Sequence, residues 1–91
     1  MNSRSLEYIV ALHETGSLHA AAHRCHATPG TVSAQISRME SYLGVRIFVS
    51  RSDPAVLTEQ GLRILPEMSK AVAQLREVRR VAMKEQQLLA S

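Results

Sequence analysis

The sequence contains one cysteine, no tryptophan and one phenylalanine among its 91 residues. A single cysteine cannot form an intramolecular disulfide, so Cys25 excludes a disulfide framework and fits a reducing compartment. Long apolar runs are also missing, since Glu7 interrupts the stretch from Leu6 to Leu12 and no signal peptide or membrane span is predicted. We therefore expect a cytoplasmic protein with no membrane partner.

The chain also lacks the features from which active sites are built. Its length supports one small core, but not a second domain with a ligand pocket. It has no paired carboxylates, no nucleophile beside a base and no glycine loop that could cradle a phosphate. We expect neither an enzyme nor a cofactor.

The charge of the chain is modestly positive and unevenly distributed. Eleven Lys and Arg against eight Asp and Glu give a formal charge of +3. Within residues 17–51 the only acidic residue is Glu40, whereas residues 52–91 nearly balance. A positive first half suits a polyanionic partner such as nucleic acid. The basic residues of that segment are Arg24, Arg38, Arg46 and Arg51.

Apolar periodicity predicts two helices before residue 25. Residues 3–15 form an amphipathic pattern that Gly16 ends. Ser17 is then placed as the N-cap of a short second helix with small apolar residues, and a tight turn follows at about 25–27. These small residues would let another helix approach closely.

A third helix is predicted to start at Thr28-Pro29 and to stop at Gly44. Thr28 can cap the free amides of the first turn, and Pro29 is preorganised for the first helical position. Glycine readily adopts the left-handed conformation that ends many helices. The buried face is expected to comprise Val32, Ile36, Met39, Tyr42 and Leu43.

Two short β-prone runs follow, at residues 47–49 and 55–57. The turn-rich segment 50–54 separates them and contains Asp53-Pro54. This pattern predicts a small hairpin, which would form a wing beside the third helix.

A final helix is predicted from Thr58 to about Gln87. Pro66 lies inside it and should either kink the helix or mark a later start. Because the helix is too long for so small a domain to cover, we interpret its apolar stripe as a dimer surface, part of which could instead pack against the first helix. That stripe consists of Leu65, Met68, Val72 and Leu75, with Ala82 beyond.

The second and third helices, joined by a short turn, are typical of a helix-turn-helix. Short hydroxyl side chains can approach base edges, while Gln and Arg can make bidentate contacts. The amides at Thr28 are placed to bind a phosphate. The alternative is a plain three-helix bundle whose third helix is merely solvated, and the hairpin argues against it. The exposed face is expected to present Thr31, Ser33, Ala34, Gln35, Ser37 and Arg38.

Three histidines surround the cysteine in and after the second helix. His19, His23 and His26 could approach one another and form a metal site with Cys25. We favour solvent-facing histidines and a small buried cysteine, and expect no metal. Protonation of these histidines would strengthen DNA binding below about pH 6.5.

The sequence resembles the N-terminal region of LysR-type transcriptional regulators over almost its whole length. Several short motifs in the right order and spacing make this resemblance specific. Cys25-His26 and Gln35-Ile36 are also similar to the peroxide-sensing OxyR branch, which is too little to assign a subfamily. The motifs are Ser17–Ala22, Ala27–Thr28, Val32–Ile36, Met39–Glu40, Leu43–Phe48 and Leu57–Gly61.

The resemblance implies a mainly α fold, with a winged helix-turn-helix DNA-binding domain over residues 1–58 and a linker and dimerisation helix over residues 59–91. It implies a homodimer on an inverted repeat in double-stranded DNA, with half-sites about 34 Å apart or a multiple of that. The recognition helix, about 28–43, would enter the major groove and the wing, about 47–57, the minor groove. The resemblance does not decide whether the intact regulator is a dimer or a tetramer. A small-molecule or redox effector would bind a domain absent from this chain.

Carried over by position, the resemblance also implies individual sites. Thr28 matches a phosphate-capping serine, Ser33 a DNA-facing serine, and Thr58 the cap of the linker helix. The expected DNA-binding residues are Ser17, Thr28, Pro29, Gly30, Thr31, Ser33, Gln35, Arg38 and Arg51. We expect Thr31, Ser33, Gln35 and Arg38 to carry most of the readout.

The chain departs from the family pattern at several of these positions. Pro29-Gly30 stands where Gln-Pro is common, and Ala34 where Arg often follows the matched serine. Arginines of the wing are replaced by Ser50, Asp53 and Pro54, for which Arg51 could substitute. We therefore expect DNA binding that is weaker or more dependent on DNA shape than that of a typical member of the family. The alternative is a dimeric antagonist that has lost DNA affinity.

Overall fold

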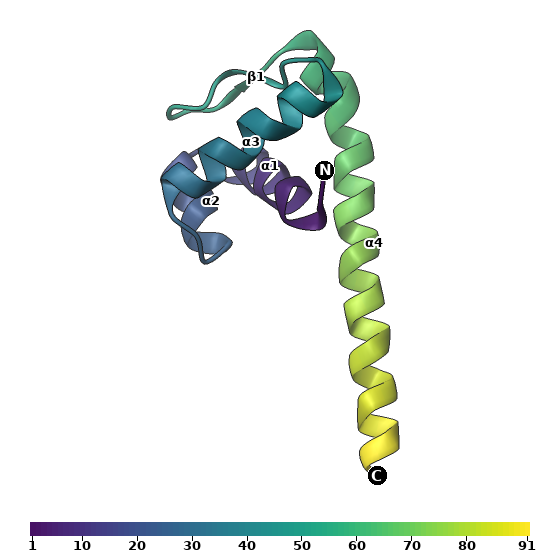
Figure 1. Ribbon diagram of the computed structural model, residues 1–91. Coiled ribbons are helices and arrows are strands. Elements are labelled where there is room, and N and C mark those ends of the chain that lie inside the picture. Colours follow the sequence, from purple (N-terminus) through teal and green to yellow (C-terminus); the bar gives the residue numbers. More distant parts are fainter.

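The computed structural model describes residues 1–91 as four helices and one two-stranded antiparallel sheet (Figure 1). The elements are α1 (Ser3–Thr15), α2 (Leu18–Arg24), α3 (Pro29–Leu43), β1 (Phe48–Ser50), β2 (Val56–Leu57) and α4 (Glu59–Ala90). Three helices, a hairpin wing and a long final helix are the predicted fold, which is thereby confirmed.

Local hydrogen bonds explain where the helices begin. The side-chain oxygens of Ser17, Thr28 and Thr58 accept from the amides of Ala20, Thr31 and Gly61, respectively. These three N-caps confirm the predictions. The fourth cap, Asn2, starts α1 by accepting from the Ser5 amide. Gly16 and Gly44 end α1 and α3 with φ angles of 74° and 73°, which other residues adopt reluctantly.

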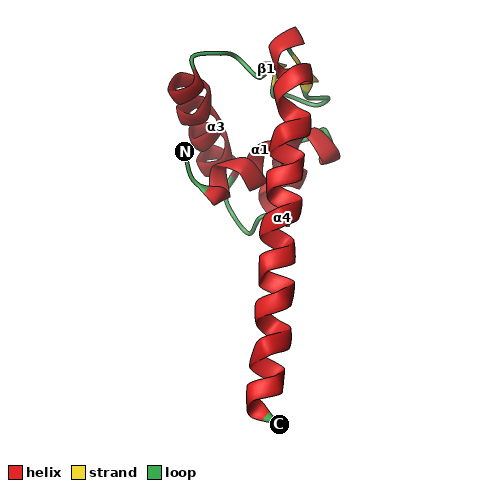
Figure 2. Cartoon of the chain, turned by 90° about the vertical axis from the view of Figure 1, so that its right-hand side faces the viewer, coloured by secondary structure: helices red, strands yellow, loops and turns green.

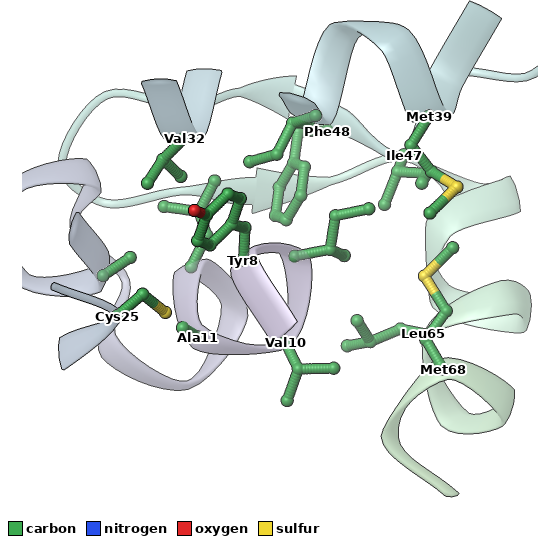
Figure 3. Packing of buried hydrophobic residues seen from close by; sticks show 14 of the residues in the cluster. Tyr8, Val10, Ala11, Cys25, Val32, Met39, Ile47, Phe48, Leu65 and Met68 are labelled. Atoms are coloured by element: carbon green, nitrogen blue, oxygen red, sulfur yellow. The ribbon is translucent and has the colours of Figure 1, made fainter. Parts of the chain in front are cut away.

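Helix α1 lies at the centre of the core, because α2, α3 and α4 all pack against it (Figure 3). Every residue from Tyr8 to Leu12 is buried, rather than one amphipathic stripe. Phe48 and Ile47 close the core from the wing side. Each such large apolar side chain contributes about 1.5–3 kcal/mol by burial, so this central helix holds the domain together.

The end of α3 differs from the prediction. Val32, Ile36 and Met39 are buried as expected, but Tyr42 and Leu43 are exposed by 67% and 37%. The buried stripe stops before the last turn because the half-buried Glu40 faces the start of the wing there and accepts two backbone amides. The assignment of Tyr42 and Leu43 to the core was therefore wrong.

The wing is a short antiparallel hairpin with an irregular register. Phe48 lies opposite Leu57 and Ser50 opposite Val56, so the register shifts between the two pairs. The amide of Ala55 donates to the carbonyl of Gly16 at 2.8 Å and ties the returning strand to the turn after α1. The wing is thus held by contacts outside its own ladder.

Helix α4 begins at Glu59 and continues through Pro66, so Pro66 does not mark a later start. The first half of α4 packs across α1 and buries Leu65, Met68 and Val72, which are at most 5% exposed. These three side chains were expected on a dimer surface, but α1 covers them within one chain, which fits the alternative that part of the stripe packs against the first helix. Leu75 is only half-buried.

The second half of α4 projects away from the rest of the domain (Figure 2). Every residue from Arg76 onward is exposed. The longest dimension of the molecule is consequently 50 Å, against 24 and 19 Å for the other two. None of the helices combines the length and the apolar character needed to cross a bilayer.

Candidate nucleic-acid interface

The N-terminus of α3 presents free hydrogen-bond donors to solvent. The Thr28 hydroxyl accepts from the Thr31 amide at 3.1 Å and donates to the Thr31 hydroxyl at 2.9 Å. Pro29 has no amide hydrogen, and the Val32 amide donates to the Thr28 carbonyl. The donors left for a ligand are therefore the Gly30 amide and the Thr31 hydroxyl. Thr28 itself acts as a cap whose hydroxyl hydrogen is already used.

Gly30 leaves the surface open at this helix end. A Cβ built on Gly30 would meet no atom within 4 Å. The glycine is thus not required by packing inside the chain. It allows a ligand to approach the α3 backbone closely.

The solvent-facing side of α3 carries small and polar side chains. Thr31, Ala34, Ser37 and Arg38 are exposed, whereas Ser33 and Gln35 are half-buried. Arg38 forms no ion pair in the chain, which makes it the free cation of this helix. Short side chains beside one free arginine are suited to contacts with the edges of bases.

Gln35 is turned partly toward α1. Its Oε1 lies 3.1 Å from the hydroxyl of Ser5, whose single hydrogen is shared between Gln35 and Asn2 Oδ1, 3.0 Å away. Ser5 is only 4% exposed. The carbonyl of Gln35 is thus partly engaged, and its amide nitrogen is the group that stays free. A bidentate contact to adenine, which needs both groups, would require Gln35 to release Ser5.

Arg51 lies on the wing but turns back onto α3. Its Nη1 donates to the Ser33 carbonyl at 2.9 Å, to Ser33 Oγ at 3.0 Å and to Ser37 Oγ at 2.9 Å. Its Nη2 forms an ion pair with Glu40 at 2.5 Å. The guanidinium that was expected to reach DNA is therefore bound within the chain.

Glu40 joins α3 to the wing and was not among the predicted sites. While one carboxylate oxygen pairs with Arg51, the other accepts from the amides of Ile47 at 2.7 Å and Phe48 at 3.2 Å. The side chains of Glu40 and Arg51 are only 11% and 22% exposed. A signal was available in the sequence, since Glu40 is the only acidic residue of the basic segment.

Internal ion pairs reduce the positive charge that the sequence suggested for this face. Arg24 pairs with Glu14 at 2.6 Å, as Arg51 does with Glu40. Arg46 is exposed and donates to the Phe48 carbonyl at 3.3 Å. The tip of the wing carries the exposed Asp53 and no free arginine. Free cationic charge on this side thus comes from Arg38 and Arg46.

The region around Cys25 offers no site for a metal. His19, His23 and His26 are exposed, and no group of three His, Cys, Asp or Glu residues is arranged to hold an ion. Burial raises the pKa of the Cys25 thiol, and the positive charges of Arg4 and Arg24 only partly oppose that shift. Cys25 is a small buried residue, 8% exposed. Ser17, one of the residues expected to bind DNA, is half-buried and caps α2.

A helix-turn-helix followed by a hairpin beside its second helix defines the class of winged helix-turn-helix proteins, which bind nucleic acid. The chain belongs to the LysR family, because residues 3–62 match the family described as bacterial regulatory helix-turn-helix protein, lysR family. The predicted family resemblance is confirmed. The chain therefore contains the DNA-binding domain of this family of transcription regulators.

Individual relatives agree with this assignment. The chain is 42% identical over 79 residues to a hydrogen peroxide-inducible genes activator of Pectobacterium carotovorum subsp. carotovorum, covering 87% of this chain and 25% of that protein. A full-length OxyR variant from Pseudomonas aeruginosa superposes with a TM-score of 0.83 at 32% identity, over 92% of this chain and 28% of that one. The chain thus spans about a quarter of the length of these relatives.

The fold is also similar to a domain that was solved with DNA. The complex of the BenM DNA-binding domain with benA site 1 DNA superposes with a TM-score of 0.80 at 27% identity, over 94% of both chains. The similarity covers α1 to α4 almost completely, so it extends to the long final helix.

Proposed function

We propose that this chain reads an inverted repeat in double-stranded DNA as a homodimer and thereby regulates transcription. The observation that carries the proposal is the open polar face of α3, with the unpaired Gly30 amide and Thr31 hydroxyl at its N-terminus and the free Arg38 beyond. The DNA complex of the similar BenM domain supports it. Helix α3 would enter the major groove and the wing would lie over the adjacent minor groove.

The proposed contacts divide into two kinds. The Gly30 amide and Thr31 hydroxyl would bind backbone phosphate, which fixes the position of the helix on the duplex. Arg38 and the amide nitrogen of Gln35 would reach base edges. With so few free cations, we expect a shallow salt dependence and a large share of readout through DNA shape.

The proposed dimer surface lies farther along α4 than the sequence suggested. Leu75 and Val78 form an apolar groove of about 420 Å³ with Met1 and Leu6 at the start of α1. Val81 and Ala82 continue this surface toward the C-terminus. A second copy of α4, packed antiparallel, would cover an apolar face that one chain leaves exposed.

The intact regulator would act in the cytoplasm, where bacterial DNA lies, and would have no enzymatic role. A small-molecule or redox effector would bind outside the region shared with this chain. A tetramer would likewise need contacts beyond it.

Selection of bound sequences from a random duplex pool tests the proposal, followed by affinity measurements at several salt concentrations. We expect an inverted repeat whose half-sites are separated by a whole number of helical turns. Arg38→Met should weaken binding about 5- to 150-fold, the effect of about 1–3 kcal/mol per lost base contact. Arg63→Met, on the exposed surface of α4, is the control. A folded dimer that binds no duplex at low salt would instead identify the antagonist alternative.

A further inference from the structure

The contacts of Arg51 suggest a role that no wing residue was expected to have. Both terminal nitrogens of its guanidinium form hydrogen bonds within the chain, with Ser33, Ser37 and Glu40. The ion pair of Arg51 with Glu40 is largely buried. A phosphate would have to displace these partners and leave Glu40 uncompensated on the DNA-facing side. Arg51 is therefore poorly placed to bind a phosphate of the DNA backbone.

The same contacts change what the two serines offer to DNA. A hydroxyl has one hydrogen to donate and two lone pairs with which to accept. The two hydrogens of Arg51 Nη1 are shared among the Ser33 carbonyl and the hydroxyl oxygens of Ser33 and Ser37, so each hydroxyl accepts from the guanidinium. Neither hydroxyl hydrogen has a partner in the chain. A guanidinium about 3 Å away also repels an approaching N–H group. Both serines are thereby set as hydrogen-bond donors.

Donor hydroxyls discriminate among bases in the major groove. Guanine presents the acceptors N7 and O6, adenine presents N7 and thymine presents O4. Cytosine alone presents only an amino donor at its major-groove edge. A serine held as a donor therefore accepts three of the bases and disfavours cytosine.

We infer that Arg51 is a positioning residue that fixes Ser33 and Ser37 as donors, so that the regulator excludes cytosine at the base positions these serines face. The inference rests on the proposed function, because it requires α3 to lie in the major groove. It assigns the unusual arginine of the wing to specificity rather than to affinity. Glu40 holds Arg51 in place by binding the start of the wing at the same time.

The test compares base preferences selected by several variants from a random duplex pool. Ser33→Ala and Ser37→Ala locate the base positions that each hydroxyl faces. The double variant Arg51→Met with Glu40→Gln removes the guanidinium without leaving an unpaired carboxylate, and Glu40→Gln alone is its control. Circular dichroism and thermal unfolding establish that each variant is folded.

We expect wild type to bind sites with cytosine at these positions about five-fold more weakly, the effect of one hydrogen bond of about 1 kcal/mol. The double variant should tolerate cytosine there, with an unchanged slope of log affinity against log salt. Loss of a phosphate contact would instead reduce that slope by about 0.9.

Two results would overturn the inference. One is cytosine exclusion that persists in the double variant. The other is a fall of about 0.9 in the slope of log affinity against log salt, which would mean the loss of one phosphate contact. Ser37→Ala gives an independent measurement, since Ser37 is exposed and its loss leaves the ion pair intact. If wild type tolerates cytosine where Ser37→Ala changes the preference, the inference fails while the proposed function stands. If wild type binds no duplex, both fail.

Discussion

At the start of α3 the absence of a side chain determines how closely another molecule can approach. Replacement of Gly30 by alanine should raise the free energy of unfolding by up to about 1 kcal/mol, because alanine loses less backbone entropy in a helix. The added methyl group would lie in open space in the free protein but between α3 and bound DNA. We therefore expect Gly30→Ala to be more stable yet to bind DNA more weakly.

Urea unfolding and fluorescence anisotropy with a labelled duplex measure the two effects of Gly30→Ala. Ala73→Gly, at an exposed position of α4, is the reverse change far from α3. It should lower stability by about 1 kcal/mol and leave DNA affinity unchanged. Unchanged DNA affinity in Gly30→Ala would contradict a close approach of the backbone.

Burial of Cys25 links its thiol to stability at alkaline pH. Burial raises the pKa of the thiol above its ordinary value, so the folded state holds the proton more tightly than the unfolded state. This contribution is fully present below the ordinary thiol pKa of about 8.5 and is lost as pH rises through the raised value. The difference in unfolding free energy between wild type and Cys25→Ala should thus be constant at neutral pH and shrink above it.

The reaction of Cys25 with a thiol reagent provides a second measurement of its burial. We expect slow modification at pH 8 in the folded protein and rapid modification in urea, because the thiolate is the reactive species. Equal rates in both states would show that the thiol is accessible. Unfolding by urea at several pH values completes the comparison.

At the scale of single residues, the sequence predicted backbone features better than side-chain directions. Ser17 and Thr28 were identified as caps because a cap depends on neighbours two or three positions away, whereas Thr58 was identified through the family resemblance. The direction of Arg51 depends on the irregular strand register and on Glu40, eleven positions earlier in the chain. No local pattern in the sequence contains that information.

At the scale of elements, the wing and the start of α4 lie in close contact. A Cβ on Gly61 would lie 2.2 Å from the carbonyl oxygen of Ile47, which is backbone and cannot move aside cheaply. Thr58 also binds this region, since its amide donates to the same carbonyl at 2.9 Å. Gly61 therefore allows α4 to start directly against the wing.

Replacement of Gly61 by alanine should lower the free energy of unfolding by about 1–3 kcal/mol, the usual cost of overpacking. Gly30→Ala is the matched control, being the same change at an open position. Urea unfolding followed by circular dichroism provides the measurement. A Gly61→Ala protein as stable as wild type would show that α4 can shift away from the wing without cost.

The helices and strands themselves were predictable because the apolar periodicity agrees with the residues that begin and end each element. The use of the α4 stripe was only partly predictable: the spacing of Leu65, Met68 and Val72 fits both a core and a dimer surface. Which of the two applies depends on where α1 lies against α4, a long-range contact. The burial of every residue from Tyr8 to Leu12 of α1 was missed for the same reason.

For the whole molecule, the proposed dimer makes a prediction about the exposed part of α4. Val78→Asp should place a charge in the interface and convert the dimer to a monomer, while the domain remains folded because Val78 is 57% exposed in one chain. Ala73→Asp adds the same charge at another exposed position of the helix and should not affect assembly. Sedimentation velocity separates the two states. A Val78→Asp protein that remains dimeric would place the interface elsewhere.

If α4 dimerises as proposed, its division into a buried half and a projecting half would couple helix formation to assembly. Residues 76–91 contact little of their own chain, and most helical stability in proteins comes from packing against other elements. A partner helix would supply the missing contacts, so by mass action the melting temperature should rise with protein concentration. The amides of this segment should exchange with solvent faster on dilution. Two half-sites on one duplex would raise the local concentration of the chain, so the DNA itself would help to order the end of α4.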